Sequence, residues 1–222
     1  MCGRFVLIAD PNAIQQEFNL ASLPDLTPRY NIAPTQGVAV ITNEKPDELT
    51  FHRWGLIPSW AKEPEIGNKM INARSEGVED KPAFRAAFKR RRCIIPASGF
   101  YEWKKLDAKQ KAPMYIHLKD QEVFGLAGLW EIWYDPDGGE WRTATILTTD
   151  ANEFMRPIHD RMPVILPRES YAAWLQPGEV PAAQLKPLLK PYDPNAMTAY
   201  EVSKLVNRPG ADVPECIAPL AS

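Results

Sequence analysis

The residue with the most distinctive chemistry is Cys2, which directly follows the initiator methionine in the opening sequence MCGRF. Removal of Met1, which a small second residue favours, would leave an α-amine and a thiol on one residue. Their unperturbed pKa values of about 7.7 and 8.5 make both groups partly available as nucleophiles near neutral pH. Together they can capture an aldehyde, first as an imine and then as a five-membered thiazolidine ring. The simpler interpretation of this stretch alone is a small, buried side chain near a chain end.

Polar residues also interrupt two segments that are otherwise predicted to be extended. In KMINARSE, Asn72, Arg74 and Glu76 alternate, so one face of the segment would carry three polar groups. In GFYEWKK, Glu102 lies between two aromatic residues of a predicted strand. A carboxylate there either faces solvent or lies in a pocket that tunes its protonation. Asn72 has a simpler role open to it as well, as the cap of a turn.

A third polar group is the sequence RPIHDRMPVIL, in which His159 and Arg161 come just before an apolar strand. The end of a loop is a common location for functional side chains. His159 could equally be a structural histidine with satisfied hydrogen bonds. The basic run FKRRRC is interpreted as a solvated helix end, whose cations suit the helix C-terminus.

Other catalytic chemistries find little support. The three cysteines and three histidines lack the spacing of a metal site, so we expect no metal. GxSxG, GxGxxG and GxxxxGK[ST] are all absent, and we expect no cofactor.

Composition limits the class of protein. The chain has 222 residues, 45% of them hydrophobic, which suffices for a sizeable core. No apolar run reaches the ~20 residues of a membrane span and no signal peptide is evident, so we expect no membrane association. Three well-separated cysteines indicate a reducing cytoplasm. With a net charge of −2, any nucleic-acid binding must come from a local basic face.

The elements that must position these residues are short. Strands are predicted at 37–42, 48–54, 92–97, 99–105, 113–119, 123–134 and 141–149, with a hairpin turn at 135–139. Helices are predicted at 10–20, 81–92, 168–176 and 182–190. Many strands with few helices between them favour an α+β fold, in which short helices flank a barrel-like, mainly antiparallel β core. We expect one domain over residues 1–222, with 208–222 as an extended C-terminal tail.

The motifs follow one another in a familiar order: MCGRF, RYNIAPTQ, RWGLIPSWAK, INARSE, RCIIPASGFYEWKK, LAGLWEIW, TTDANEFMRPIHDRMPVIL and YEVSKLVN. This order resembles the SRAP family, the SOS-response-associated peptidases or abasic-site-processing proteins, from residue 2 to 207. The resemblance implies a DNA-damage protein that binds single-stranded DNA and crosslinks covalently to abasic sites, as a DNA-associated monomer.

The resemblance also implies roles for the polar residues. Cys2 is the nucleophile, whose amine forms the Schiff base with the ring-opened sugar and whose thiol closes the thiazolidine. Glu102 transfers protons as a general acid and base. His159 holds the sugar hydroxyl or phosphate and assists proton transfer, and Asn72 orients the imine by hydrogen bonds.

The DNA strand would be held by further residues that match the family. Arg4, Arg74 and Arg161 would grip phosphates, Asn31 and Pro34 shape the loop beside the N-terminus, and Trp60 and Trp103 could stack on bases. Two alternatives remain open: a thiol peptidase with Cys2 as nucleophile, including self-removal of Met1, and a non-covalent module that binds single-stranded DNA. Strand cleavage by β-elimination could accompany the main reaction when the thiol fails to trap the imine.

Overall fold

Five strands form a closed barrel in the computed structural model, which describes residues 2–220. The strand order is β10-β4-β3-β6-β9, and β9 pairs back with β10 to complete the ring. The strands are β3 (Gly37–Thr42), β4 (Lys45–Trp54), β6 (Arg92–Ala97), β9 (Phe124–Tyr134) and β10 (Glu140–Asp150). Every pair is antiparallel except β4 with β10. Met1 and residues 221–222, where the predicted removal of Met1 and the end of the predicted tail fall, lie outside the described residues.

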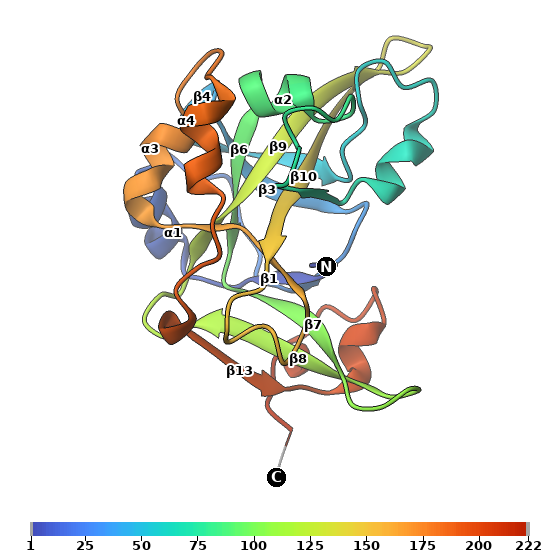
Figure 1. The fold of residues 1–222 in the computed structure, drawn as a ribbon, viewed down its shortest axis with the longest axis vertical. Coiled ribbons are helices and arrows are strands. Elements are labelled where there is room, and N and C mark those ends of the chain that lie inside the picture. The colour runs from blue at the N-terminus through green and yellow to red at the C-terminus, as the bar shows by residue number, and fades with distance from the viewer. Residues whose placement is uncertain (1, 221–222) are drawn as a thin grey trace.

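A second, open sheet carries the N-terminal strand. Its order is β13-β8-β7-β1-β2, all antiparallel. The strands are β1 (Phe5–Leu7), β2 (Arg29–Ile32), β7 (Gly99–Lys105), β8 (Lys111–Leu118) and β13 (Met197–Glu201). In Figure 1, β1 crosses the middle of the molecule, with the barrel above it and β7, β8 and β13 below. The segment before β1 therefore lies between the two sheets.

Three short strands extend the barrel sheet. They are β5 (Asn72–Arg74), β11 (Arg161–Pro163) and β12 (Ile165–Leu166). β5 pairs with β10 in parallel and β11 pairs with it antiparallel, while β12 pairs with β9. The C-terminal half of β10 therefore pairs with both β5 and β11, so the segment around Asn72 lies near the segment that follows His159.

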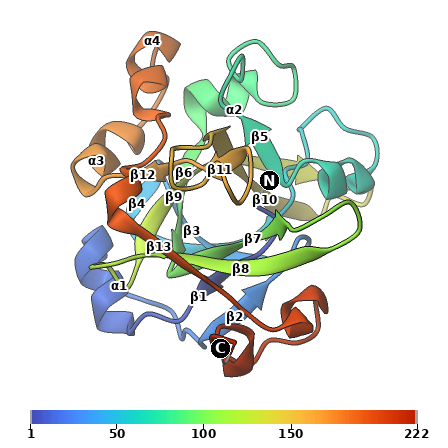
Figure 2. The same cartoon turned by 60° about the horizontal axis from the view of Figure 1, so that its bottom comes forward.

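The helices are short and lie at the periphery (Figure 2). The α-helices are α1 (Pro11–Phe18), α2 (Arg85–Arg90), α3 (Tyr171–Trp174) and α4 (Ala182–Leu185). The 3-10 helices are Pro64–Lys69, Arg168–Ser170, Lys186–Leu188, Pro194–Ala196, Lys204–Asn207 and Pro214–Cys216. Asp10 caps α1 as predicted, because its carboxylate accepts a hydrogen bond from the backbone N–H of Asn12 at 2.8 Å. The α+β class with a barrel-like, mainly antiparallel core is confirmed. No helix among residues 2–220 is both long and apolar enough to cross a membrane.

The basic run at the end of α2 is exposed at Lys89 and Arg90, as its sequence suggested, but not at Arg92. Arg92 is fully buried at the start of β6. Its guanidinium donates hydrogen bonds to the backbone carbonyls of Lys89, Trp174 and Gln176, the last at 2.5 Å. These carbonyls satisfy the buried charge and tie the end of α2 to the segment after α3. Burial lowers the pKa of Arg92 to about 10.

Most residues of the C-terminal segment 208–220 are exposed, but Cys216 is buried and Asp212 bonds the backbone of β2. Its single 3-10 helix, Pro214–Cys216, buries the side chain of Cys216, and Val202 pairs with Pro219 in an isolated bridge. Ile217 also packs against an apolar cluster on the outer face of the open sheet. Val6 and Tyr101 on that face form a small apolar cluster with Val202 and Val206. Figure 2 shows the C-terminal segment, in red, beside β2.

Candidate active site

Cys2 lies buried between the two sheets, just before β1. Its side chain is 0% exposed, and its Sγ atom lies 3.7 Å from the carbonyl oxygen of Arg4. Asn72, at the start of β5, donates a hydrogen bond from Nδ2 to the carbonyl oxygen of Cys2 at 2.8 Å. The backbone N–H of Tyr101 donates to the carbonyl of Arg4 at 3.0 Å. The N-terminal residues are therefore held from both sheets, by β5 on one side and β7 on the other.

Glu102 reaches the same place from β7. Its side chain is 2% exposed in the middle of a strand whose register sets Glu102 opposite Met114. Because side chains alternate along a strand, Glu102 points away from the face on which Tyr101 packs against the C-terminal segment. Its Oε2 atom lies 3.8 Å from Nε2 of His159. The exposed-strand interpretation of Glu102 is thus excluded by its burial.

His159 comes from the turn between β10 and β11. The side chain of Asn152 shapes this turn by accepting a hydrogen bond from the backbone N–H of Met155 at 2.9 Å. His159 Nδ1 accepts a hydrogen bond from the backbone N–H of Arg161 at 3.0 Å, which leaves Nε2 as the protonated nitrogen of the neutral ring, on the side of Glu102. Asp160, whose side chain is exposed, also places Oδ1 at 2.9 Å from Nδ1, a contact that would favour the protonated ring.

The electrostatics of the site follow from burial. Burial raises the pKa of Glu102 to about 7. Burial, and then the negative charge of Glu102, raise the pKa of the Cys2 thiol. The pKa of His159 is lowered, because burial outweighs the opposing effect of Asp160. A neutral thiol, a neutral imidazole and a carboxyl that titrates near pH 7 form a set suited to moving protons rather than to holding a permanent thiolate.

The three predicted phosphate-binding arginines differ in their surroundings. Arg161 is 10% exposed and forms a bidentate pair with Glu76 at 2.9 Å, and it also contacts Asp150 at 2.6 Å. Arg4 donates from Nη1 to Asn31 Oδ1 at 3.0 Å and to the backbone carbonyl of residue 206 at 2.6 Å. Arg74 is exposed at the end of β5, and within the described chain its guanidinium has no hydrogen-bond or ion-pair partner.

The other residues predicted to contact DNA differ in how much of each side chain is exposed. Asn31 is fully buried, and Pro34 is half-buried in the turn after β2. Trp103 is half-buried, and its Nε1 donates to Asn207 Oδ1 at 2.8 Å. Trp60 is 60% exposed, in the loop between β4 and β5. Of these residues, Trp60 has the most surface available to a base.

Neither a metal nor a deep pocket accounts for this cluster. Among residues 2–220, no group of three or more His, Cys, Asp or Glu side chains could hold a metal ion. A cleft of about 500 Å³ opens at the opposite end of β1, lined by Ser98, His117 and Tyr200 among others. It contains none of the four clustered residues.

Sequence reasoning missed the partners that hold the site together. Asp150 pairs with Arg161, and Asp212 contacts the backbone of β2, although 181 residues separate Asp212 from Asn31. A signal did exist for Glu76, because its alternation with Arg74 in the extended segment put it on a polar face. For Asp212, no pattern in the tail distinguishes it from a solvated aspartate.

The comparisons with known proteins cover the whole site. The family model of the SOS response associated peptidases matches residues 1–209. An abasic site processing protein of Bacillus subtilis, YoqW, is 49% identical over 221 residues, which is 98% of this chain and 99% of that protein. An abasic site processing protein of Xenopus tropicalis, HMCES, is 34% identical over 86% of this chain and 66% of its own length.

A solved structure shares the same architecture. The crystal structure of a protein from Bacteroides thetaiotaomicron superposes with a TM-score of 0.87 at 30% identity, over 99% of this chain and 100% of that one. The matched region of the family model includes all four clustered residues, from Cys2 to His159. The chain therefore belongs to the SOS response associated peptidase (SRAP) family.

Proposed function

We propose that this protein processes abasic sites in single-stranded DNA by forming a covalent thiazolidine crosslink through Cys2 after removal of Met1. The observation that carries the proposal is the convergence of Asn72, Glu102 and the second residue of the chain. Asn72 Nδ2 bonds the Cys2 carbonyl at 2.8 Å, and the charge of Glu102 acts on the Cys2 thiol. The curated relatives YoqW and HMCES, named as abasic site processing proteins, support the choice of substrate.

The reaction needs no external oxidant or reductant. The α-amine of Cys2 attacks the aldehyde carbon of the ring-opened deoxyribose, and loss of one water gives an imine. The thiol sulfur then bonds to the imine carbon while its proton passes to the nitrogen, which closes the ring. One water is released overall, and in the product the former aldehyde carbon is bonded to both the nitrogen and the sulfur of Cys2.

Glu102 is suited to carry the protons of these steps. With a pKa of about 7, the carboxyl is about half protonated at neutral pH, so it can donate to the leaving hydroxyl and accept from the thiol. His159, 3.8 Å from Glu102, would hold the sugar or a phosphate and support this transfer. Asn72 would fix the carbonyl of Cys2 and thereby the direction of the amine.

For the DNA strand, the contacts favour Arg74 as the first phosphate ligand, because its guanidinium is exposed and not engaged by the described chain. A phosphate would have to reach Arg4 or Arg161 beside their present protein partners. Of the two predicted stacking residues, Trp60 exposes more of its ring than Trp103 does. Trp103 and Pro34 are half-buried and would contribute less, while Asn31 is buried and would act through the Arg4 side chain that it holds.

The surroundings of Cys2 do not favour a thiol peptidase. Such an enzyme needs a thiolate, and a positive neighbour normally lowers the thiol pKa to provide it. Here burial and the charge of Glu102 raise the pKa of the Cys2 thiol instead. Peptidase chemistry limited to Met1, and a side reaction that cuts the DNA strand, remain compatible with the same groups.

A denaturing gel tests the proposal. The protein is mixed with a single DNA strand that carries one abasic site. The control is a strand of the same sequence with an intact nucleotide at that position. We expect a heat-stable shifted band with the abasic strand alone, and its loss in Cys2→Ala. A band that Cys2→Ala forms equally well would contradict the thiazolidine, and binding without any band would favour a non-covalent module.

A further inference from the structure

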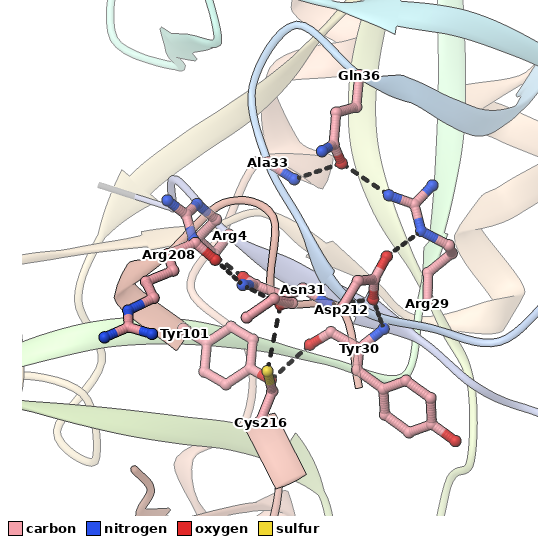
Figure 3. Close-up of polar contacts among 11 residues, drawn as sticks. Arg4, Arg29, Tyr30, Asn31, Ala33, Gln36, Tyr101, Arg208, Asp212 and Cys216 are labelled. Carbon is pink, nitrogen blue, oxygen red and sulfur yellow. Dashed lines mark hydrogen bonds and ion pairs between the residues drawn. The ribbon is translucent and has the colours of Figure 1, made fainter. Parts of the chain in front are cut away.

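The C-terminal residues 203–217, here called the clasp, bind the strands that carry the proposed reacting groups. The clasp contains the 3-10 helices Lys204–Asn207 and Pro214–Cys216 and runs along β2, the edge strand of the open sheet. Figure 3 shows Arg4, which precedes β1, together with side chains of β2 and β7 beside the clasp. These contacts are polar and join segments about 180 residues apart in the sequence.

Asn31 is the centre of the contact between the clasp and Arg4, the residue before β1. Its Nδ2 atom donates to three clasp carbonyls, those of Val206 at 3.2 Å, Arg208 at 3.0 Å and Ala211 at 2.7 Å. Its Oδ1 atom accepts from Arg4 Nη1 at 3.0 Å, and the same nitrogen of Arg4 donates to the carbonyl of Val206 at 2.6 Å. Arg4, two residues after the nucleophile, is thereby held by β2 and the clasp together.

Asp212 secures the other side of β2. Its Oδ1 atom accepts hydrogen bonds from the backbone N–H groups of Tyr30 at 2.5 Å and Asn31 at 3.0 Å, and its Oδ2 atom accepts one from Arg29 Nε. An edge strand leaves such backbone donors without a strand partner. The carboxylate takes the place of that partner, and charge-assisted bonds of this kind are stronger than neutral ones.

The clasp also reaches the strand of Glu102. Trp103 Nε1 donates to Asn207 Oδ1 at 2.8 Å, and Tyr101 packs in an apolar cluster with Val206. Glu102 lies between these two aromatic residues on β7. One short segment therefore contacts the neighbours of both Cys2 and Glu102.

Residues 2–4 are held to the sheets through two backbone carbonyls, that of Cys2 by Asn72 and that of Arg4 by the N–H of Tyr101, and the clasp adds a bond to the Arg4 side chain. The first ladder pairs of β1 begin at Phe5, so the nucleophile lies outside the regular strand. Chain ends are poorly ordered unless they are tied down. Covalent chemistry at this end requires its atoms within a fraction of an ångström of the productive position.

We propose that Asn31 and Asp212 are positioning residues, which set the N-terminal nucleophile against Glu102 by way of the clasp. This inference rests on the proposed crosslinking function. Neither residue touches the reacting atoms. Loss of the clasp contacts loosens residues 2–4 and lowers the rate of the covalent step, while the phosphate-binding Arg74 on β5 stays in place.

The test compares Asp212→Asn with Asp193→Asn. Asparagine keeps the size of the side chain but removes the charge that faces Arg29. Asp193 is a matched control, because it too accepts a backbone N–H bond, from Asn195 at 2.9 Å, but in an exposed segment beside the end of β8. Arg29→Gln is a milder second variant that keeps the Asp212 carboxylate.

Three quantities are measured for each protein. Hydrogen exchange reports the order of residues 2–7, a denaturing gel gives the crosslinking rate at saturating abasic DNA, and fluorescence anisotropy gives the affinity for an unmodified single strand. For Asp212→Asn we expect faster exchange in residues 2–7 and a crosslinking rate lowered about tenfold or more, with affinity nearly unchanged. Arg29→Gln should change the exchange and the crosslinking rate in the same directions but by less. Asp193→Asn should match wild type in all three measurements.

Unchanged exchange in residues 2–7 of Asp212→Asn overturns the clasp. So does faster exchange with a wild-type crosslinking rate, because the segment would then only stabilise the fold. If the wild-type protein forms no crosslink, the proposed function fails. Exchange in residues 2–7 then still decides whether the clasp orders the N-terminus.

Discussion

Replacing Glu102 with glutamine should stabilise the fold while it removes proton transfer. Burial raises the pKa of Glu102 from its ordinary value of 4.5 to about 7. This pKa difference of about 2.5, at about 1.4 kcal/mol for each pKa unit, means that ionised Glu102 destabilises the folded state by about 3.5 kcal/mol. The unfolded carboxyl loses its proton near pH 4.5 and the folded one near pH 7, so the free energy of unfolding falls as pH rises through that range.

Glutamine does not titrate, so the Glu102→Gln variant escapes this cost. Its free energy of unfolding should exceed that of wild type by up to about 3 kcal/mol at pH 8, and by much less at pH 4. Urea unfolding at both pH values measures the difference. Glu131→Gln is the matched control: burial also raises the pKa of Glu131, but its carboxylate pairs with Arg91 at 2.6 Å. That variant should be destabilised, because it leaves a guanidinium without its partner.

The same change should slow release from a crosslink. At pH 7 a carboxyl with a pKa of about 7 is about half protonated, whereas one with a pKa of 4.5 would be about 0.3% protonated. The acid form that protonates the leaving sulfur is thus roughly 150-fold more abundant. Transfer of a pre-formed crosslink to an excess of an aminooxy trap measures release, which should fall on the order of 10²–10⁴-fold in Glu102→Gln. Wild-type release, or a loss of stability at pH 8, would refute the reasoning.

Further predictions concern the neighbours of this group and the rest of the barrel. Asn72→Ala loses the 2.8 Å bond to the Cys2 carbonyl and should slow crosslinking about tenfold on a gel time course, whereas affinity for intact single strands stays at the wild-type value. Arg74→Ala should lower the slope of log affinity against log salt by about 0.7 in a fluorescence titration, with the exposed Lys190→Ala as control; an unchanged slope would remove Arg74 from the interface. Burial, and then the charge of Arg142, lower the pKa of the buried His52 from 6.5 to about 4. The unfolded histidine therefore gains its proton near pH 6.5 and the folded one only near pH 4, so the free energy of unfolding is highest above pH 6.5 and falls as pH drops toward 4. In urea unfolding, the His52→Leu variant should show a smaller fall of this free energy between pH 6.5 and 4.

Much of the fold followed from local patterns. The strands predicted at 37–42, 92–97 and 99–105 match β3, β6 and β7, because alternating or continuous apolar runs between turn residues carry enough local information. The strands at 5–7, 29–32 and 197–201 were not predicted. They are three to five residues long, and their pairing with distant strands determines them more than their own sequence does.

The sequence singled out candidate site residues that the fold brings together, but it did not indicate the contacts that hold them in place. Cys2, Glu102 and His159 stood out because their chemistry was unusual for their positions. The pairing of Arg161 with Glu76 and the bond between Asp212 and β2 depend on the folded topology. Arg92 shows the same limit: a basic run suggested solvent, yet backbone carbonyls that only the fold brings together satisfy its charge.

The intact mass of the DNA adduct tests the central claim most directly. The protein is incubated with a single strand carrying one abasic site and analysed by mass spectrometry without reduction. The thiazolidine predicts one adduct whose mass is that of the chain lacking Met1, plus that of the strand, minus one water. Fragmentation should place the DNA on Cys2. An adduct that retains Met1, or a DNA attachment mapped to a lysine, would contradict the account.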